Sequence, residues 1–399
     1  MRLPKDFAWL VPIVALFVAT FAVNTAENIV AGLLPGIASD LRVDIPTAGQ
    51  LITGYALGVA VAGPLLALVT TGVSRRNLLL VTIGIFVLGN VICAISTNYA
   101  MLMVARLLTA ACQGLFFGVA MIIATQLAPE GRQTTALSLV VAGVTVASIA
   151  GVPIGTAVGN AYGWHMAFWA IAVAGAVAAG VLALLIPPGL RQERLSGAQI
   201  LTEVRAAVRP VVLLCYAIIV FFMMGAIVLI AYMVPLLTQV SGVSMTYVPW
   251  VLFGMGATGF FGNLLGGRLG DWNPVATMVG ILTLCIGLLF VMAQVVTNTW
   301  PMLIVLWTLW FVGFGFVAPI QGRILKEASD APNFASTLIS TAFNVGIACG
   351  AAIGGAAIAW GWGYRSLPWL DLSSECVALG GTLLLATVAK QSRVASATA

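Results

Sequence analysis

Apolar segments of about twenty residues recur along the whole chain, and they restrict its fold more than any other feature. Each segment is long enough to cross ~30 Å of hydrocarbon as a helix. A backbone exposed to lipid must satisfy its own hydrogen bonds, which leaves helices or closed barrels. The segments are too long, and alternate too little, for barrel strands. We therefore expect an all-α polytopic membrane protein.

The composition agrees, because 61% of the residues are hydrophobic and only 7% are charged, against about 25% charged in a soluble domain. Turns and charged residues divide the chain into twelve candidate helices. Their expected ranges are 8–36, 47–70, 78–96, 100–127, 135–161, 165–187, 210–236, 247–269, 276–296, 301–325, 334–360 and 369–389. We expect an N-terminal six-helix bundle over residues 1–187, a polar linker over 188–209 and a C-terminal six-helix bundle over 210–399.

The basic residues are distributed unevenly between the two sides of the predicted topology. Short cytoplasmic loops are enriched in Lys and Arg, and with both termini inside, fourteen of the 17 basic residues fall on that side. Only Arg42 and Arg365 fall outside, and Arg106 lies within a helix. The net charge of +5 is therefore explained by topology in the cell (inner or plasma) membrane, and we expect no nucleic-acid partner.

The two halves of the chain repeat one another at an offset of 200 residues. The shift aligns Pro35 with Pro235, Gly54 with Gly254, and "GWHMAFW" (163–169) with "GYRSLPW" (363–369). An ancestral duplication predicts two six-helix bundles related by pseudo-two-fold symmetry. Parallel repeats of this kind suit a transporter whose substrate site lies between the halves.

Two corresponding helices also share a ladder of small residues at every fourth position. The ladders consist of Gly143, Ala147, Gly151, Gly155 and Gly159 in the first half and of Gly346, Gly350 and Gly354 in the second. One face of each helix therefore lacks large side chains, so we expect a neighbouring backbone to approach it closely.

Four segments carry recognisable motifs: "ENIVAGLLPGIASDLRVDIPTAGQLITGYALGVAVAGPLLA" (27–67), "LMVARLLTAACQGLFFGVA" (102–120), "VAGVTVASIAGVPIGTAVG" (141–159) and "GNLLGGRLGDW" (262–272). Together they resemble the major facilitator superfamily, and more narrowly its twelve-span drug:proton antiporter branch, which includes chloramphenicol-resistance and arabinose-efflux-like proteins. The resemblance implies alternating access. It also implies gating or conformational roles for residues of the loop and fifth-helix motifs, namely Arg75, Arg76, Gly151, Pro153, Gly155, Arg268 and Asp271.

Two ionisable residues, Glu27 and Arg106, look clearly embedded in the membrane, where such groups suggest function. By helical rise, Glu27 lies ~12 Å and Arg106 ~10 Å below the outer surface, so contact is plausible. We expect Glu27 to carry a proton and Arg106 to be its partner. Two alternatives stay open: a structural ion pair joining the first and fourth helices, or direct contact of Glu27 with a cationic or hydroxyl-bearing substrate.

Neighbouring polar residues extend this site. Asn24, Glu27 and Asn28 are spaced i, i+3, i+4 and share one helical face, and Gln113 lies two turns inward of Arg106. The second half offers aromatic side chains and one amide, so we expect a cavity with one polar and one aromatic wall. The expected substrate-binding residues are Asn24, Asn28, Gln113, Tyr232, Trp310, Phe311 and Asn344.

No constellation for hydrolysis, redox chemistry or nucleotide binding is visible in the sequence. The six cysteines lack metal-site or disulfide spacing, and the single histidine, His165, is expected in an outer loop. We expect no enzyme activity, no metal and no cofactor, and an ion gradient as the energy source.

The leading hypothesis is a monomeric, proton-coupled secondary transporter that exports a small amphipathic, drug-like compound by alternating access. Its partners would be the substrate, protons and the lipid bilayer. Alternatives in the same class are efflux of a sugar, nucleoside or other metabolite, and proton-coupled import. A non-transporting membrane sensor or scaffold is the alternative from a different class.

Overall fold

The computed structural model describes residues 9–70, 73–186, 205, 208–328 and 332–398, and the secondary structure of these residues is entirely helical. The chain divides into two compact units, residues 1–195 and 196–399. The predicted linker, residues 188–209, lies almost wholly outside the described residues.

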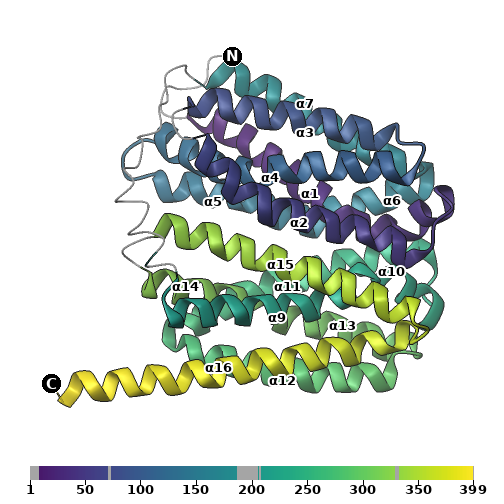
Figure 1. The fold of residues 1–399 in the computed structure, drawn as a ribbon. Coiled ribbons are helices and arrows are strands. Elements are labelled where there is room, and N and C mark those ends of the chain that lie inside the picture. The colour runs from purple at the N-terminus through teal and green to yellow at the C-terminus, as the bar shows by residue number, and fades with distance from the viewer. Residues whose placement is uncertain (1–8, 71–72, 187–204, 206–207, 329–331, 399) are drawn as a thin grey trace. The chain divides into compact units, whose positions relative to one another are not determined.

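The first unit begins with a long helix that contacts most of the others. Its elements are α1 (Leu10–Asp40), α2 (Ile45–Val69), α3 (Arg75–Ala94), α4 (Tyr99–Leu127), α5 (Gln133–Val146), the π-turn η2 (Ala147–Gly151), α6 (Val152–Tyr162) and α7 (Trp164–Leu185). α2 packs on α4, and α3 packs on both α4 and α7 (Figure 1).

The second unit repeats this pattern around α9. Its elements are α9 (Pro210–Ala231), α10 (Met233–Pro235), η3 (Leu236–Val240), η4 (Met245–Tyr247), α11 (Val248–Trp272), α12 (Pro274–Val295), α13 (Thr299–Phe314), α14 (Val317–Glu327), α15 (Pro332–Ala359), η5 (Tyr364–Ser366) and α16 (Leu367–Thr398). α15 and α16 both pack on α9, and α16 also packs on α12.

Twelve helices in the described residues are long and apolar enough to cross a membrane, which confirms the predicted number of spans. The first span continues past its expected end at residue 36 as far as Asp40, so Pro35 lies inside α1 and does not end it. The Arg42 backbone then takes a positive φ of 54° in the short turn before α2.

Side-chain caps explain where several helices begin. Asp44 accepts a 2.7 Å hydrogen bond from the backbone N–H of Thr47 at the start of α2, and Asn98 accepts one of 2.9 Å from Met101 at the start of α4. Each cap satisfies one of the N–H groups that have no partner in the first helical turn. The two Thr47 bonds, first to the hydroxyl and then to the N–H, hold the pKa of Asp44 below its ordinary value.

The fifth span is interrupted, although the sequence predicts one continuous helix over 135–161. A π-turn, Ala147–Gly151, separates α5 from α6, and Pro153 follows it at the start of α6. Proline cannot donate a backbone hydrogen bond and crowds the carbonyl four residues earlier. The turn absorbs this conflict without ending the span.

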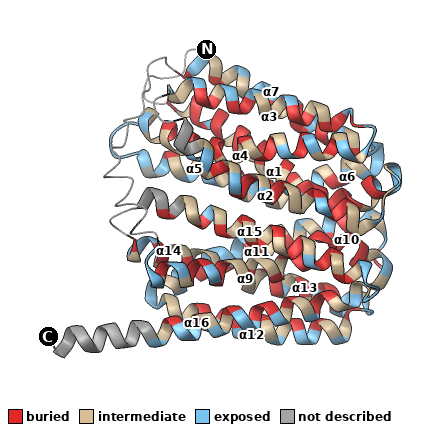
Figure 2. Cartoon of the chain, viewed as in Figure 1, coloured by how far each residue is buried: buried red, intermediate tan, exposed pale blue. Residues whose placement is uncertain are grey.

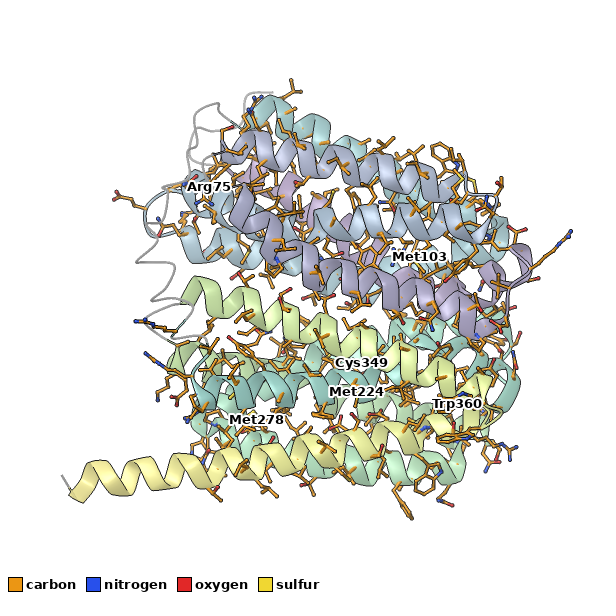
Figure 3. The ribbon with its side chains drawn as sticks, viewed as in Figure 1. Arg75, Met103, Met224, Met278, Cys349 and Trp360 are labelled. Carbon is orange, nitrogen blue, oxygen red and sulfur yellow. The ribbon has the colours of Figure 1, made fainter. Side chains whose placement is uncertain are left out.

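Both small-residue ladders are approached closely by a neighbouring backbone, as the sequence predicts, and the neighbour is the first spanning helix of the same unit, α1 or α9. A β-carbon added at Gly143 would lie 2.7 Å from the Phe17 carbonyl oxygen of α1. One added at Gly346 would lie 2.7 Å from the Val220 carbonyl oxygen of α9. These helices approach backbone to backbone; Met224 of α9, labelled in Figure 3, lies against the second ladder at Gly350.

Large apolar side chains remain exposed on the outside of the helices, as expected for a surface that contacts lipid. Over the most apolar 18-residue window, the share of buried residues is 56% in the first span but 33% in α12. Figure 2 shows exposed residues along α12 and α16. Exposed tryptophans gather near helix ends: Trp250, Trp272, Trp300, Trp360 and Trp362. Tryptophan is enriched at membrane–water interfaces.

Candidate functional site

The polar stripe of α1 is formed as the spacing predicts. The side-chain amides of Asn24 and Asn28 donate 3.0 Å hydrogen bonds to the carbonyl oxygens of Thr20 and Asn24, one turn earlier. Because both amide groups are turned back to the helix, the two amide oxygens remain as acceptors. Glu27 lies between them, half-buried, while Asn28 is exposed.

Arg106 of α4 reaches across to α1 and is almost completely buried, with 1% of its surface exposed. Its guanidinium donates to the carbonyl oxygens of Ala26 at 2.5 Å and Glu27 at 3.1 Å. Its Cζ also lies 3.9 Å from the centre of the Tyr55 ring of α2, a cation–π contact. The buried charge is therefore held by hydrogen bonds and by an aromatic face.

The Glu27 carboxylate is bonded to a different residue. Gln113 Nε2 donates a 2.6 Å hydrogen bond to Glu27 Oε2. Gln113 Oε1 in turn accepts a hydrogen bond from the Tyr55 hydroxyl. No Arg106 nitrogen lies within 4.0 Å of the Glu27 carboxylate oxygens. The four residues thus form a closed network in which glutamine, and not arginine, contacts the carboxylate.

Close packing of α2 on α4 positions Tyr55 for this network. A β-carbon at Gly58 would lie 2.9 Å from the Ala110 side chain, and one at Gly63 would lie 3.3 Å from Cα of Gly114. Small residues at both crossings let the helices approach. Met103, labelled in Figure 3, fills the same interface opposite Gly54.

Of the two arginines predicted to act in gating at the start of α3, Arg76 bonds to the end of another helix. Arg76 donates 2.7 Å hydrogen bonds from Nε to the Ile186 carbonyl and from Nη2 to the Ala183 carbonyl, and so caps the end of α7. The neighbouring Arg75 side chain, labelled in Figure 3, is half-buried.

The fifth-helix motif lies against α1. Gly151 contacts Thr25 and Phe21, and Gly155 contacts Ile29, while Pro153 is buried. The motif therefore contacts the helix that carries Glu27.

Arg268 and Asp271, near the end of α11, are both exposed. They are not joined by an ion pair within 4.0 Å.

The predicted substrate residues of the second unit are mostly packed. Tyr232 is fully buried, and its hydroxyl donates to the Ala351 carbonyl at 2.9 Å. Trp310 is 8% exposed and Phe311 is half-buried. Asn344 is buried with its Oδ1 unbonded.

The structure adds residues to two sets predicted from the sequence, the ionisable residues embedded in the membrane and the members of the Glu27 site. Glu27 and Arg106 are not the only embedded ionisable residues: Asp371 and Glu375 of α16 are each 3% exposed within the last span. Tyr55 is a network member that the sequence analysis missed. The signal for the acids was their position inside the predicted helix 369–389, whereas nothing in the sequence pairs Tyr55 with Gln113.

The single histidine has a structural setting at the ends of α1 and α7. His165 Nε2 lies 3.1 Å from the Ser96 carbonyl and 3.9 Å from Asp40 Oδ2. The neighbouring Trp164 donates to the same Asp40 oxygen at 3.0 Å. The described residues contain no group of three or more His, Cys, Asp or Glu side chains able to hold a metal ion.

Twelve helices of the described residues are long and apolar enough to cross a bilayer, so the chain is a polytopic membrane protein. The sequence profile of the Major Facilitator Superfamily matches residues 16–321, so the chain belongs to this superfamily. It is 35% identical over 357 residues to the inner membrane transport protein YdhP of Escherichia coli, covering 90% of this chain and 91% of that protein. It is 33% identical to the uncharacterized MFS-type transporter YtbD of Bacillus subtilis, covering 86% and 87%.

A solved structure shares the fold. A bacterial homologue of the human lysosomal transporter Spinster, in an inward-facing and unoccupied conformation, matches with a TM-score of 0.68 and 16% identity. The match covers 97% of this chain and 96% of that one. Members of the superfamily bind small-molecule substrates and typically act as monomers.

Proposed function

We propose that this protein exports a small amphipathic, drug-like compound in exchange for protons, by alternating access. The observation that carries the proposal is the network of Glu27, Gln113, Tyr55 and Arg106. Ionisable groups within membrane spans are costly and are retained mostly for function.

Glu27 is suited to carry the proton because the residue is only half-buried and its carboxyl is only partly neutralised. It is half-buried, it accepts one hydrogen bond from the neutral Gln113, and Arg106 donates to main-chain carbonyls instead of to the carboxylate. A carboxyl locked in a direct ion pair would hold its negative charge, whereas this one can exchange a proton with water.

The accessible atoms of the α1 stripe favour a class of substrate. The amides of Asn24 and Asn28 donate to their own helix, so their oxygens and the Glu27 carboxyl present acceptors. Such a surface suits a compound that carries a cationic or hydrogen-bond-donor group beside an apolar body. We propose the aromatic residues Trp310 and Phe311 as contacts for that apolar body, together with Tyr232 and Asn344 when the second unit rearranges.

The orientation and gating proposals follow from charge and contacts. We propose that both termini face the cytoplasm in the inner membrane, with Arg75, Arg76, Arg268 and Asp271 on that side.

The fifth-helix motif would allow α1 to move against the fifth span, since Gly151, Pro153 and Gly155 lie on the side of that span that packs on α1.

The test is pH-gradient-driven transport in proteoliposomes with two probes, ethidium as an amphipathic cation and chloramphenicol as a neutral, hydroxyl-bearing compound. Glu27→Gln should abolish the accumulation of any probe that the wild-type protein concentrates. Glu130→Gln, at an exposed loop position, is the matched control and should transport normally. Accumulation by Glu27→Gln at the wild-type rate would refute the role of Glu27, and accumulation that ignores the pH gradient would refute proton coupling.

A further inference from the structure

The second unit contains a pair of acids that the Glu27 network does not use. Asp371 and Glu375 lie one turn apart on α16, so they share a helical face. Each has 3% of its surface exposed. Glu375 lies half-way along the span Tyr364–Thr387, where an uncompensated charge is most costly.

Within the described part of the chain, neither acid has a cationic partner. No Lys, Arg or His nitrogen of the described residues lies within 4.0 Å of either carboxyl group. Asp371 Oδ1 and Glu375 Oε2 are buried and accept no hydrogen bond. Two carboxylates one helical turn apart in a buried site without a counter-charge cannot both stay ionised.

The helix packed against the pair is shaped to accommodate it. A β-carbon added at Gly225 of α9 would collide with the Asp371 carboxylate, so glycine leaves the space that the acid occupies. Between the two acids, the Ser374 hydroxyl donates a 2.6 Å hydrogen bond to the Phe221 carbonyl of α9. This contact fixes α16 against α9 at the site.

The other groups on the packed elements do not supply a charge. The titratable side chains of α9, α12 and η5 are Cys215, Tyr216, Cys285, Tyr364 and Arg365. The Cys285 thiol of α12 is buried. Tyr216 donates to the Ala335 carbonyl of α15, and Arg365 is exposed.

The fold itself does not require acids here. The 200-residue offset places Ile171 and Gly175 of α7 at the positions of Asp371 and Glu375. In the first unit, Ile171 is buried and Gly175 packs on Phe86 and Val87 of α3. An apolar version of the same interface therefore packs well, so the acids serve a purpose other than packing.

We propose that Asp371 and Glu375 form a second proton-binding site, which holds one proton shared between the two carboxyl groups at neutral pH. A proton is the ligand that fits, because it neutralises one carboxyl group and allows that group to donate to an unbonded oxygen of the other. The site is separate from Glu27 and stands whether or not Glu27 drives transport.

The test is infrared spectroscopy of the full-length protein in liposomes at about pH 7, where exposed carboxyls are ionised. The Glu27→Gln variant removes the third embedded acid, so any carbonyl stretch of a protonated carboxyl should come from this pair. We expect that band in both wild type and Glu27→Gln, shifted in D₂O. It should disappear in Asp371→Asn/Glu375→Gln, whose elution on size exclusion checks folding.

Three results would overturn the proposal. The first is absence of the band from the Glu27→Gln variant, in which Asp371 and Glu375 are unchanged. The second is persistence of the band in the folded double variant. The third is a band in N-methylglucamine buffer that vanishes when Na⁺ replaces the organic cation, which would assign the site to sodium. Loss of transport in Glu27→Gln affects none of these readings, so the two proposals can fail separately.

Discussion

The way in which Arg106 is held predicts an unusual order of stability among its variants. Lysine at position 106 keeps the positive charge, but its single ammonium group cannot reproduce the two guanidinium nitrogens that donate to both α1 carbonyls. It would lose at least one charge-assisted hydrogen bond, worth about 1.5–3 kcal/mol, and most of the contact with the Tyr55 ring, worth about 0.5–2 kcal/mol. Arg106→Lys should therefore destabilise the protein by about 2–5 kcal/mol.

Methionine should be better tolerated, although it removes the charge. The carbonyls of Ala26 and Glu27 lie inside the continuous helix α1 and keep their helical hydrogen bonds. Because Arg106 forms no direct ion pair with the described residues, its removal leaves no paired carboxylate uncompensated, and the cost of burying the guanidinium charge disappears. We expect Arg106→Met to lose no more than about 2 kcal/mol.

The assay is thermal unfolding of the detergent-solubilised protein, followed by intrinsic tryptophan fluorescence. For a unit of this size, about 1 kcal/mol corresponds to roughly 2–4 °C in the melting temperature. At the mid-points of the two ranges, about 3.5 and about 1 kcal/mol, Arg106→Lys should melt roughly 5–10 °C below Arg106→Met. Equal melting temperatures, or a lower value for methionine, would show that the charge itself, and not its hydrogen-bonding geometry, stabilises the site.

Three further predictions follow from single contacts. Gly346→Ala should lower stability by about 1–3 kcal/mol because its β-carbon meets the α9 backbone, whereas Gly280→Ala, with open space around it, should be neutral in the same melts. Tyr55→Phe removes the hydroxyl that bonds Gln113 and should reduce proton-driven transport about five- to tenfold with little change in expression; unchanged rates would exclude Tyr55 from the network's function. The pKa of Asp44 is lowered in the folded state, so ionised Asp44 stabilises the fold above its ordinary pKa, and this stabilisation is lost as the pH falls through the lowered value. Asp44→Ala should therefore make the stability less dependent on pH below about pH 4, as measured by the same melts.

Much of the fold could be predicted because the membrane restricts the possible structures. Apolar runs of about twenty residues define spans directly, and the ladders at Gly143 and Gly346 identified helix faces that pack backbone to backbone. The agreement in depth between Glu27 and Arg106 also placed the two residues beside one another, and they meet at the α1 backbone.

The remaining details depend on contacts between residues distant in sequence. Tyr55 and Gln113 are 58 residues apart and meet only because α2 crosses α4 at small residues. Arg76 caps carbonyls more than 100 residues away, and no local pattern encodes that pairing. Asp371 and Glu375 did leave a signal in the sequence, because the span that contains them is the least hydrophobic of the twelve candidate spans.

The most direct test of proton exchange through Glu27 is to measure proton movement itself in proteoliposomes that contain a pH-sensitive dye. An outward gradient of a transported probe, such as ethidium, should drive protons in the opposite direction through the wild-type protein. In Glu27→Gln, the probe should still exchange between the two sides, but the internal pH should not change. Proton movement at the wild-type rate in Glu27→Gln would contradict the account.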